Sequence, residues 1–141
     1  MRRFFAAITI VFVLFGLAGC NTGKCKQNNA RLLVGTWRYE MTQKKTNGEW
    51  INIPSLSASA GKMTLQADGC ATLSMTFNDQ TLSQAFNWEL LENGDFLTDG
   101  KLLGKLVFED KNKLYLCTDE TFDPVTGEFL KGEFRDVYQR E

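Results

Sequence analysis

The sequence predicts an all-β protein, an antiparallel up-and-down meander closed into a barrel of about eight to ten strands. Three observations support this prediction. From residue 31 onward apolar side chains recur with a period of two, which is typical of strands with one buried face. Asn-Gly and Asp-Gly pairs separate the apolar runs. No stretch after residue 30 has the period of an amphipathic helix. Closing such a sheet into a barrel removes its exposed edges.

The N-terminal segment has the composition of a secretory signal. Arg2 and Arg3 precede an apolar run over residues 4–18. At about 1.5 Å per residue this run is too short for the roughly 30 Å core of a bilayer. It ends in the letters LAGC, residues 17–20.

LAGC resembles the lipobox of bacterial lipoprotein signal peptides. The resemblance implies removal of residues 1–19 as a signal peptide, attachment of a diacylglycerol to the Cys20 sulfur and acylation of the new amino terminus. Two or more acyl chains anchor a protein stably. We therefore expect a bacterial envelope protein bound to the lipid bilayer through Cys20, and Asn21 in place of Asp favours the outer membrane, facing the periplasm or the surface. An ordinary secretory signal or an uncleaved anchor is the alternative.

Composition predicts one domain behind a short linker. Residues 20–30 are polar and turn-prone and predict a flexible, lipidated tether, and residues 31–141 are enough for one barrel domain. Without Arg2 and Arg3, 14 basic residues face 17 acidic ones, a net charge of −3. No basic stripe is present, so we expect no nucleic-acid partner. We also expect a monomer.

Each predicted strand has one inward face, and turn residues follow it. In chain order these faces are Leu33, Gly35, Trp37, Tyr39 and Met41; Met63, Leu65 and Ala67; Ala71, Leu73, Met75 and Phe77; Phe86, Trp88 and Leu90; Leu106 and Phe108; Leu114 and Leu116; and Phe134, Tyr138 and Arg140. The predicted turns are Asn47-Gly48, Asp68-Gly69, Asn93-Gly94, Asp99-Gly100, Lys111-Asn112 and Thr126-Gly127. Trp50 is out of phase with its apolar neighbours, which predicts an exposed aromatic at the barrel rim.

The letters GTW at residues 35–37 resemble the G-x-W signature of the lipocalin and calycin barrels. The order of KMTLQADGCATLSM, WELLENGDFLTDG and the closing YQR resembles the lipocalin-like domains of bacterial lipoproteins, over residues 32–140. The resemblance implies that Trp37 seals one end of the barrel and that Arg140 lies across its indole as a cation–π pair. The pattern departs at Glu120, where a Tyr is expected, and no room remains for the helix that flanks larger lipocalins.

The sequence contains no histidine, which excludes imidazole bases, Ser-His-Asp triads and histidine zinc sites. We expect no enzyme activity, no metal and no cofactor. The acidic stretch at residues 119–128 lacks the ligand spacing of an EF-hand loop, so a solvated loop is favoured over a calcium site.

Two further pairs are left open by the sequence. Cys70 and Cys117 are predicted near one barrel end, where a disulfide would form only if the Cα atoms lie within about 7 Å; two separate thiols are the alternative. Asp136 shares the strand phase of Arg140 and is predicted to form a salt bridge with it, unless the strand turns it to the rim.

The inward aromatic and methionine side chains are the candidate ligand pocket, and the same residues could equally form a filled core. They are Trp37, Tyr39, Met41, Met75, Phe86, Trp88, Phe134 and Tyr138. The leading hypothesis is a barrel that binds a small apolar or amphipathic ligand, because eight strands enclose just enough space for one. The alternative is a filled barrel that contacts another envelope protein or a polysaccharide.

Overall fold

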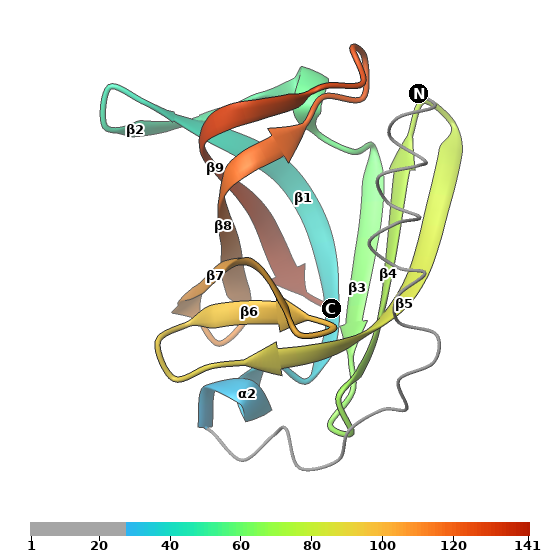
Figure 1. Ribbon diagram of the computed structural model, residues 1–141, viewed down its shortest axis with the longest axis vertical. Helices are drawn as coiled ribbons and strands as arrows, with labels where there is room; N and C mark the ends of the chain where they lie inside the picture. Colours follow the sequence, from blue (N-terminus) through green and yellow to red (C-terminus); the bar gives the residue numbers. More distant parts are fainter. Residues whose placement is uncertain (1–27) are drawn as a thin grey trace.

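Nine antiparallel strands make up most of the part of the chain that the structure describes, residues 28–141 of a computed structural model. From β3 to β9 each strand pairs with the next, and β1 pairs with both β3 and β9, which closes an eight-stranded barrel (Figure 1). β2 pairs with β1 and prolongs that hairpin beyond the barrel. The prediction of an antiparallel, up-and-down meander closed into a barrel is confirmed. In chain order the elements are α2 (Asn28–Leu33), β1 (Gly35–Thr46), β2 (Glu49–Asn52), η2 (Pro54–Leu56), β3 (Ala60–Leu65), β4 (Cys70–Phe77), β5 (Gln80–Leu90), β6 (Asp95–Thr98), β7 (Lys101–Asp110), β8 (Lys113–Phe122) and β9 (Phe129–Arg140).

Two-residue turns with positive φ angles join several of the hairpins. Asn47-Gly48 connects β1 to β2 with φ of 52° and 81°, and Asp99-Gly100 connects β6 to β7 with φ of 52° and 80°. These turns match the right-handed twist of the strands they join. A third turn of this kind, Asn78-Asp79 with φ of 48° and 65°, joins β4 to β5. This third turn was not predicted from the sequence, because it lacks the glycine that is present in the other two.

A β-bulge in β1 changes which side chains face the barrel interior. Relative to β9, one extra residue, Glu40, is inserted between Tyr39 and Met41. Beyond the bulge Thr42 faces inward and is 3% exposed, whereas Met41 lies half-buried on the outer face beside Gln43. The prediction that Met41 faces the interior is therefore wrong, because strict alternation along β1 ends at Tyr39.

The short helix α2 occupies a segment that the sequence analysis divided between the tether and the first strand. Ala30 and Leu33 are fully buried, and α2 lies against one end of the barrel (Figure 1). The Trp37 indole donates its Nε1–H to the Leu33 carbonyl at 2.8 Å. The core therefore includes Ala30, a residue that the prediction placed in the tether.

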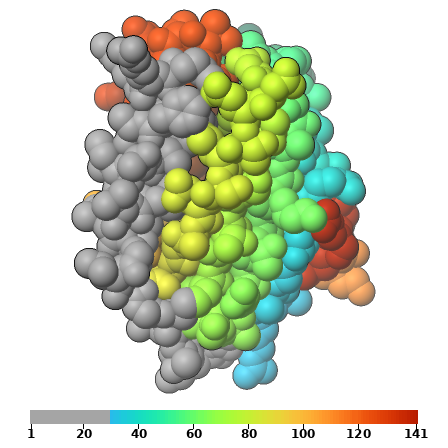
Figure 2. Space-filling model, turned by 90° about the vertical axis from the view of Figure 1, so that its right-hand side faces the viewer, coloured from blue at the N-terminus to red at the C-terminus, as the bar shows by residue number. Residues whose placement is uncertain are grey.

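The core fills the α2 end of the barrel and thins toward the other end. Trp37, Trp88 and Phe96 are fully buried, and the Trp88 and Phe96 rings stack with centroids 6.5 Å apart. Along β4 the inward side chains change from Ala71, which is 2% exposed, to Met75, which is half-buried. β1, β3, β4 and β5 lie side by side as one continuous wall (Figure 2).

Arg140, at the end of β9, joins the last strand to α2 and to the β7–β8 turn. Its guanidinium carbon lies 4.2 Å from the centroid of the Trp37 ring. Nη1 donates to the Val34 carbonyl at 3.0 Å, Nη2 donates to the Leu32 carbonyl, and Nε donates to the Lys111 carbonyl at 3.0 Å. The last carbonyls of a helix have no partner within it, and Arg140 supplies donors there. The structure thus brings together the Trp37–Arg140 pair that the resemblance implied.

We expect Arg140→Lys to lower the free energy of unfolding by about 2–4 kcal/mol, because a single ammonium cannot replace both the stacking and the three directed hydrogen bonds. Urea unfolding followed by tryptophan fluorescence measures this. Arg38→Lys is the matched control, since Arg38 is exposed and forms only a surface ion pair with Glu40 at 3.5 Å. Equal losses in both variants would contradict a structural role for the Arg140 contacts.

Candidate functional site

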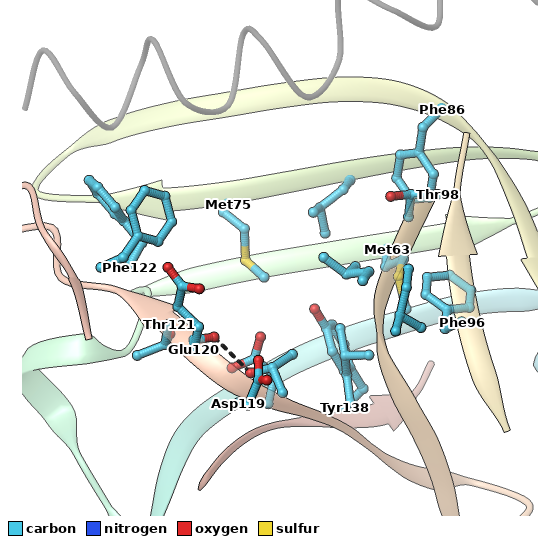
Figure 3. A pocket seen from close by; sticks show the side chains of 17 residues that line it. Met63, Met75, Phe86, Phe96, Thr98, Asp119, Glu120, Thr121, Phe122 and Tyr138 are labelled. Atoms are coloured by element: carbon cyan, nitrogen blue, oxygen red, sulfur yellow. Dashed lines mark hydrogen bonds between the residues drawn. The ribbon is translucent and has the colours of Figure 1, made fainter. Parts of the chain in front are cut away.

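A cavity of about 480 Å³ occupies the half of the barrel away from α2. Its walls are inward side chains of β3, β4, β5 and β8, and Figure 3 shows Met63, Met75 and Phe86 around it. Leu73, Phe96 and Leu116 also belong to this apolar surface. Ligand pockets of proteins typically measure about 300–1,000 Å³. The cavity is therefore large enough for one small molecule.

A chain of hydrogen bonds leads from the backbone of Ala58 to a carboxyl group at the cavity. The Ala58 backbone N–H donates to Tyr39 Oη at 3.3 Å, and the Tyr39 and Thr42 hydroxyls are 2.6 Å apart. Thr42 Oγ1 donates to Asp136 Oδ1 at 2.7 Å. Because the Thr42 proton is used on the carboxylate, the Tyr39 proton must point to Thr42. Such chains polarise each member, and this one ends at Asp136, which lines the cavity.

Burial changes the acidity of two groups that line the cavity. It raises the pKa of Asp136 from 3.8 to about 6, and the hydrogen bond from Thr42 opposes that rise only in part. Burial, together with the charge of Asp136 and the neighbouring Tyr39, raises the pKa of Tyr138 well above 10. Tyr138 therefore keeps its proton, and its hydroxyl points into the cavity (Figure 3). None of the cavity-lining residues within 28–141 is basic, so the Asp136 carboxylate has no counter-charge there.

The cavity opens where β7 and β8 separate. These strands pair from Asp110–Lys113 up to Lys105–Cys117. Beyond that point β7 continues with β6 alone and β8 with β9. The missing pairing leaves a gap in the wall, and Leu103 on β7 and Thr118 on β8, close to this gap, line the cavity.

The rim of this opening combines exposed apolar side chains with acidic ones. Leu102, Leu103 and Phe129 are 63%, 43% and 54% exposed and line the cavity mouth. Asp119 and Glu120 lie on the same rim, on β8 (Figure 3). A rim of this composition suits a molecule that carries both apolar and polar or cationic parts.

Only part of the candidate pocket predicted from the sequence lines the cavity. Met75, Phe86 and Tyr138 do so. Trp37 and Trp88 lie in the closed end of the core. Tyr39 is buried in the same core, where it packs edge-on against Tyr138 and takes part in the hydrogen-bonded chain. Phe134 borders a second hollow instead, and Met41 lies outside. The period of two along each strand identifies the inward residues. It does not show where along the barrel axis the packed core ends and the cavity begins.

The predicted rim residue Trp50 lies on the outer face of the barrel and is half-buried. The Arg135 guanidinium carbon is 4.3 Å from the Trp50 ring centroid and 3.9 Å from that of Tyr115. Arg135 also donates to Gln43 Oε1 at 2.7 Å. Trp50 borders the second hollow, of about 470 Å³, together with Phe134 and residues of β7 and β8. Four of these residues line the first cavity as well: Leu102, Leu103, Thr118 and Asp119.

The disulfide proposed between Cys70 and Cys117 is not formed. Cys117 is a free cysteine, and Cys70 is disulfide-bonded without it. The reason lies in the strand order, because β4 pairs with β3 and β5 whereas β8 pairs with β7 and β9. Cys117 is half-buried, and burial raises the pKa of its thiol.

The predicted salt bridge between Asp136 and Arg140 is replaced by two separate sets of contacts. Arg140 donates to backbone carbonyls at the closed end of the barrel. Asp136 accepts a hydrogen bond from Thr42, its cross-strand neighbour on β1. The inward phase of Asp136 could be read from the sequence. Its partner could not, because the bulge that turns Thr42 inward has no local sequence signal.

The acidic stretch at residues 119–128 spans the end of β8 and the hydrogen-bonded turn that follows it. Asp123 Oδ1 accepts the backbone N–H groups of Val125 and Thr126, at 2.8 and 3.3 Å. Over residues 28–141 no cluster of three or more acidic or cysteine side chains is suited to hold a metal ion.

The lipobox, Cys20 and most of the predicted tether lie outside the described residues. Within the part of the chain with assigned structure, no helix has the length and apolar character needed to cross a membrane.

No family model and no curated protein matches this sequence. One solved structure that is similar, titled Odorant Binding Protein OBP1, has 11% identity to this chain and a TM-score of 0.44. The similarity covers 79% of this chain and 73% of that one. These values are too low to relate the functions of the two proteins.

We expect acid to stabilise this protein through Asp136. Since its pKa of about 6 in the folded state exceeds the ordinary 3.8, the folded protein binds more protons between these values. The stabilisation is complete below about pH 3.8 and is lost as the pH rises through about 6. From about pH 7.5 to 5 the free energy of unfolding should gain roughly 1.4 kcal/mol from this group.

Unfolding curves of the wild type and of Asp136→Asn over this pH range measure that contribution as a difference in slope. Asp119→Asn, at an exposed rim position, is the control and should keep the wild-type slope. An unchanged slope in Asp136→Asn would show that this carboxyl ionises normally in the folded protein.

Proposed function

We propose that this protein is a lipid-anchored binding protein of a bacterial envelope whose barrel encloses one small amphipathic molecule. The cavity is the observation that supports this most directly, because it combines apolar walls, a suitable volume and an opening between β7 and β8. The apolar part of the ligand would lie against Met75 and Phe86. Its polar end would reach Asp136 and the Tyr138 hydroxyl.

The groups around the cavity support binding rather than catalysis. The sequence has no histidine to serve as a base near neutral pH. Thr42 has a carboxylate beside its hydroxyl, but this hydroxyl is buried between Tyr39 and Asp136 and the residue is only 3% exposed. An attacking group must reach its substrate, and Thr42 does not reach the cavity space.

The alternative function is contact with another envelope protein or a polysaccharide through the outer surface. The second hollow favours this reading, because the outer-face residue Trp50 and the buried Phe134 both line it. A filled interior, which that hypothesis assumed, does not fit a cavity of about 480 Å³. Ligand enclosure is therefore the better-supported function.

We expect Met75→Trp to weaken ligand binding at least tenfold, because the larger ring would occupy space that the ligand needs. The protein is purified under mild conditions and any bound small molecule is detected by native mass spectrometry. The affinity for that molecule, or for an apolar probe such as decanol, is then measured by calorimetry.

Val107→Trp is the matched control, since it adds the same ring on the outward face of β7, where Val107 is 44% exposed. It should bind like the wild type. Equal affinity in the Met75→Trp variant and the wild type would place the ligand outside the barrel and favour the alternative function.

We infer from the LAGC motif that Cys20 carries the membrane anchor, on the outer membrane. Protein extracted from bacterial membranes should lack residues 1–19 and carry the mass of attached acyl chains. Cys20→Ala should abolish both changes, as read by intact mass. Cys25→Ala is the control and should leave the lipid mass in place, and an unmodified mature chain would contradict the proposed anchor.

A further inference from the structure

We propose that the enclosed molecule is a cationic amphiphile, an apolar chain that ends in a protonated amine, and that Asp136 holds the amine. This inference rests on the proposed ligand-binding function and specifies the chemical class of its ligand. It follows from the free carboxylate oxygen inside the cavity, from the lack of a protein cation beside it and from the acidic rim.

The two carboxylate oxygens of Asp136 differ in their contacts. Oδ1 accepts the Thr42 hydroxyl at 2.7 Å, which fixes the orientation of the carboxylate. Oδ2 has no hydrogen-bond donor among residues 28–141, and Asp136 lines the cavity. A carboxylate with one oxygen fixed and the other open is an acceptor for a donor that the folded chain does not itself supply. A ligand ammonium group carries up to three such donors.

The negative charge of Asp136 has no basic side chain beside it in the cavity lining. Buried carboxylates are normally paired with a cation, and the nearest inward basic residue on the neighbouring strand is Lys44. Lys44 lies over the Phe134 ring, with its Nζ 5.8 Å from the ring centroid, and it does not line the cavity. The positive charge that would balance Asp136 is therefore missing from the lining, and a cationic ligand would provide it.

The rim at the mouth of the cavity carries acidic side chains. Asp119 and Glu120 are exposed on the rim, and neither forms an ion pair with a basic residue of 28–141. Clefts lined by one sign of charge concentrate ions of the opposite sign. The rim and the cavity thus both favour cations and disfavour a fatty-acid carboxylate.

A neutral ligand with a hydroxyl group is the competing possibility, because a protonated Asp136 could bind it without any charge. The two classes separate by pH. An alkylamine stays protonated up to about pH 10, as lysine does, so a change in its affinity between about pH 5 and 7.5 reports on the protein. The raised pKa of Asp136, about 6, predicts that the amine binds better at the higher pH.

Other titratable or charged groups near Asp136 do not account for such a change. The pKa values of Tyr39, Tyr138 and Cys117 are all raised, so these groups stay neutral throughout this range. The charged groups that lie around the cavity or beside Asp136 on the neighbouring strands are Lys44, Asp119 and Glu120. A control substitution on the rim therefore separates the carboxylates there from Asp136.

The experiment is isothermal titration calorimetry of the full chain with decylamine, decanol and decanoate, which share one apolar chain. At about pH 7.5 decylamine should bind about 10- to 100-fold more tightly than decanol, which is the value of a hydrogen bond to a charged group, and decanoate most weakly. Asp136→Asn should remove that advantage and leave decanol unchanged. Asp119→Asn measures the smaller contribution of the rim. Glu49→Gln removes an exposed carboxyl on β2 that lines no cavity, and as the control it should leave the decylamine affinity unchanged.

The wild type alone provides a second measurement that does not depend on the folding of a variant. Its ratio of decylamine to decanol affinity should fall about tenfold from pH 7.5 to 5 as Asp136 takes up a proton. Tighter binding of decanoate than of decylamine, or a constant ratio, would overturn the amine assignment while enclosure of a ligand stands. If none of the three compounds binds, the proposed function itself is contradicted.

Discussion

The guanidinium of Arg140 closes one end of the barrel, and the position of the cavity depends on that closure. By donating to carbonyls of Leu32, Val34 and Lys111 while it covers Trp37, it fixes α2, the first strand, the last strand and the β7–β8 turn together. Gly35 belongs to the same arrangement, because a side chain would be strained at its φ of +138° and an added Cβ would lie 2.8 Å from Arg140 Nη1. With the large side chains gathered at this end, the opposite half of an eight-stranded barrel is left unfilled.

The ionised carboxylate of Asp136 destabilises the folded protein, because its contacts do not compensate for its loss of solvation. A carboxylate moved from water into an apolar wall loses solvation, and one hydrogen bond from Thr42 restores only part of it. An apolar residue at this place would suit the core better, as replacements of buried charges elsewhere indicate. Groups that lower stability without structural benefit are most often retained for function. Asp136 lines the cavity rather than the closed end of the barrel, so the function for which it is retained would be ligand binding.

The sequence predicted the fold better than the site, for physical reasons that differ from residue to residue. The period of two and turns such as Asn47-Gly48 depend on local backbone preferences, so they are visible in the sequence. The helix α2 is six residues long, too short to show a helical period, and its burial depends on tertiary contacts. The placement of Met41 and Thr42 was reversed by a bulge, which local composition does not reveal. The role of Asp136 was misassigned because the donors of Arg140 were engaged by a helix that had not been predicted.

The bulge at Glu40 connects the closure of the barrel to the candidate site. Because side chains alternate along a strand, a shift of one residue moves every later side chain to the other face. Without the extra residue, Thr42 would point outward, and Asp136 would lose the donor that orients it. The two strands at the seam, β1 and β9, therefore carry both features: Trp37 and Arg140 at the closed end, and Thr42 and Asp136 where the cavity begins. Since the same pairing that closes the barrel also places the carboxylate, a change in its register would alter the site even if every strand were still formed.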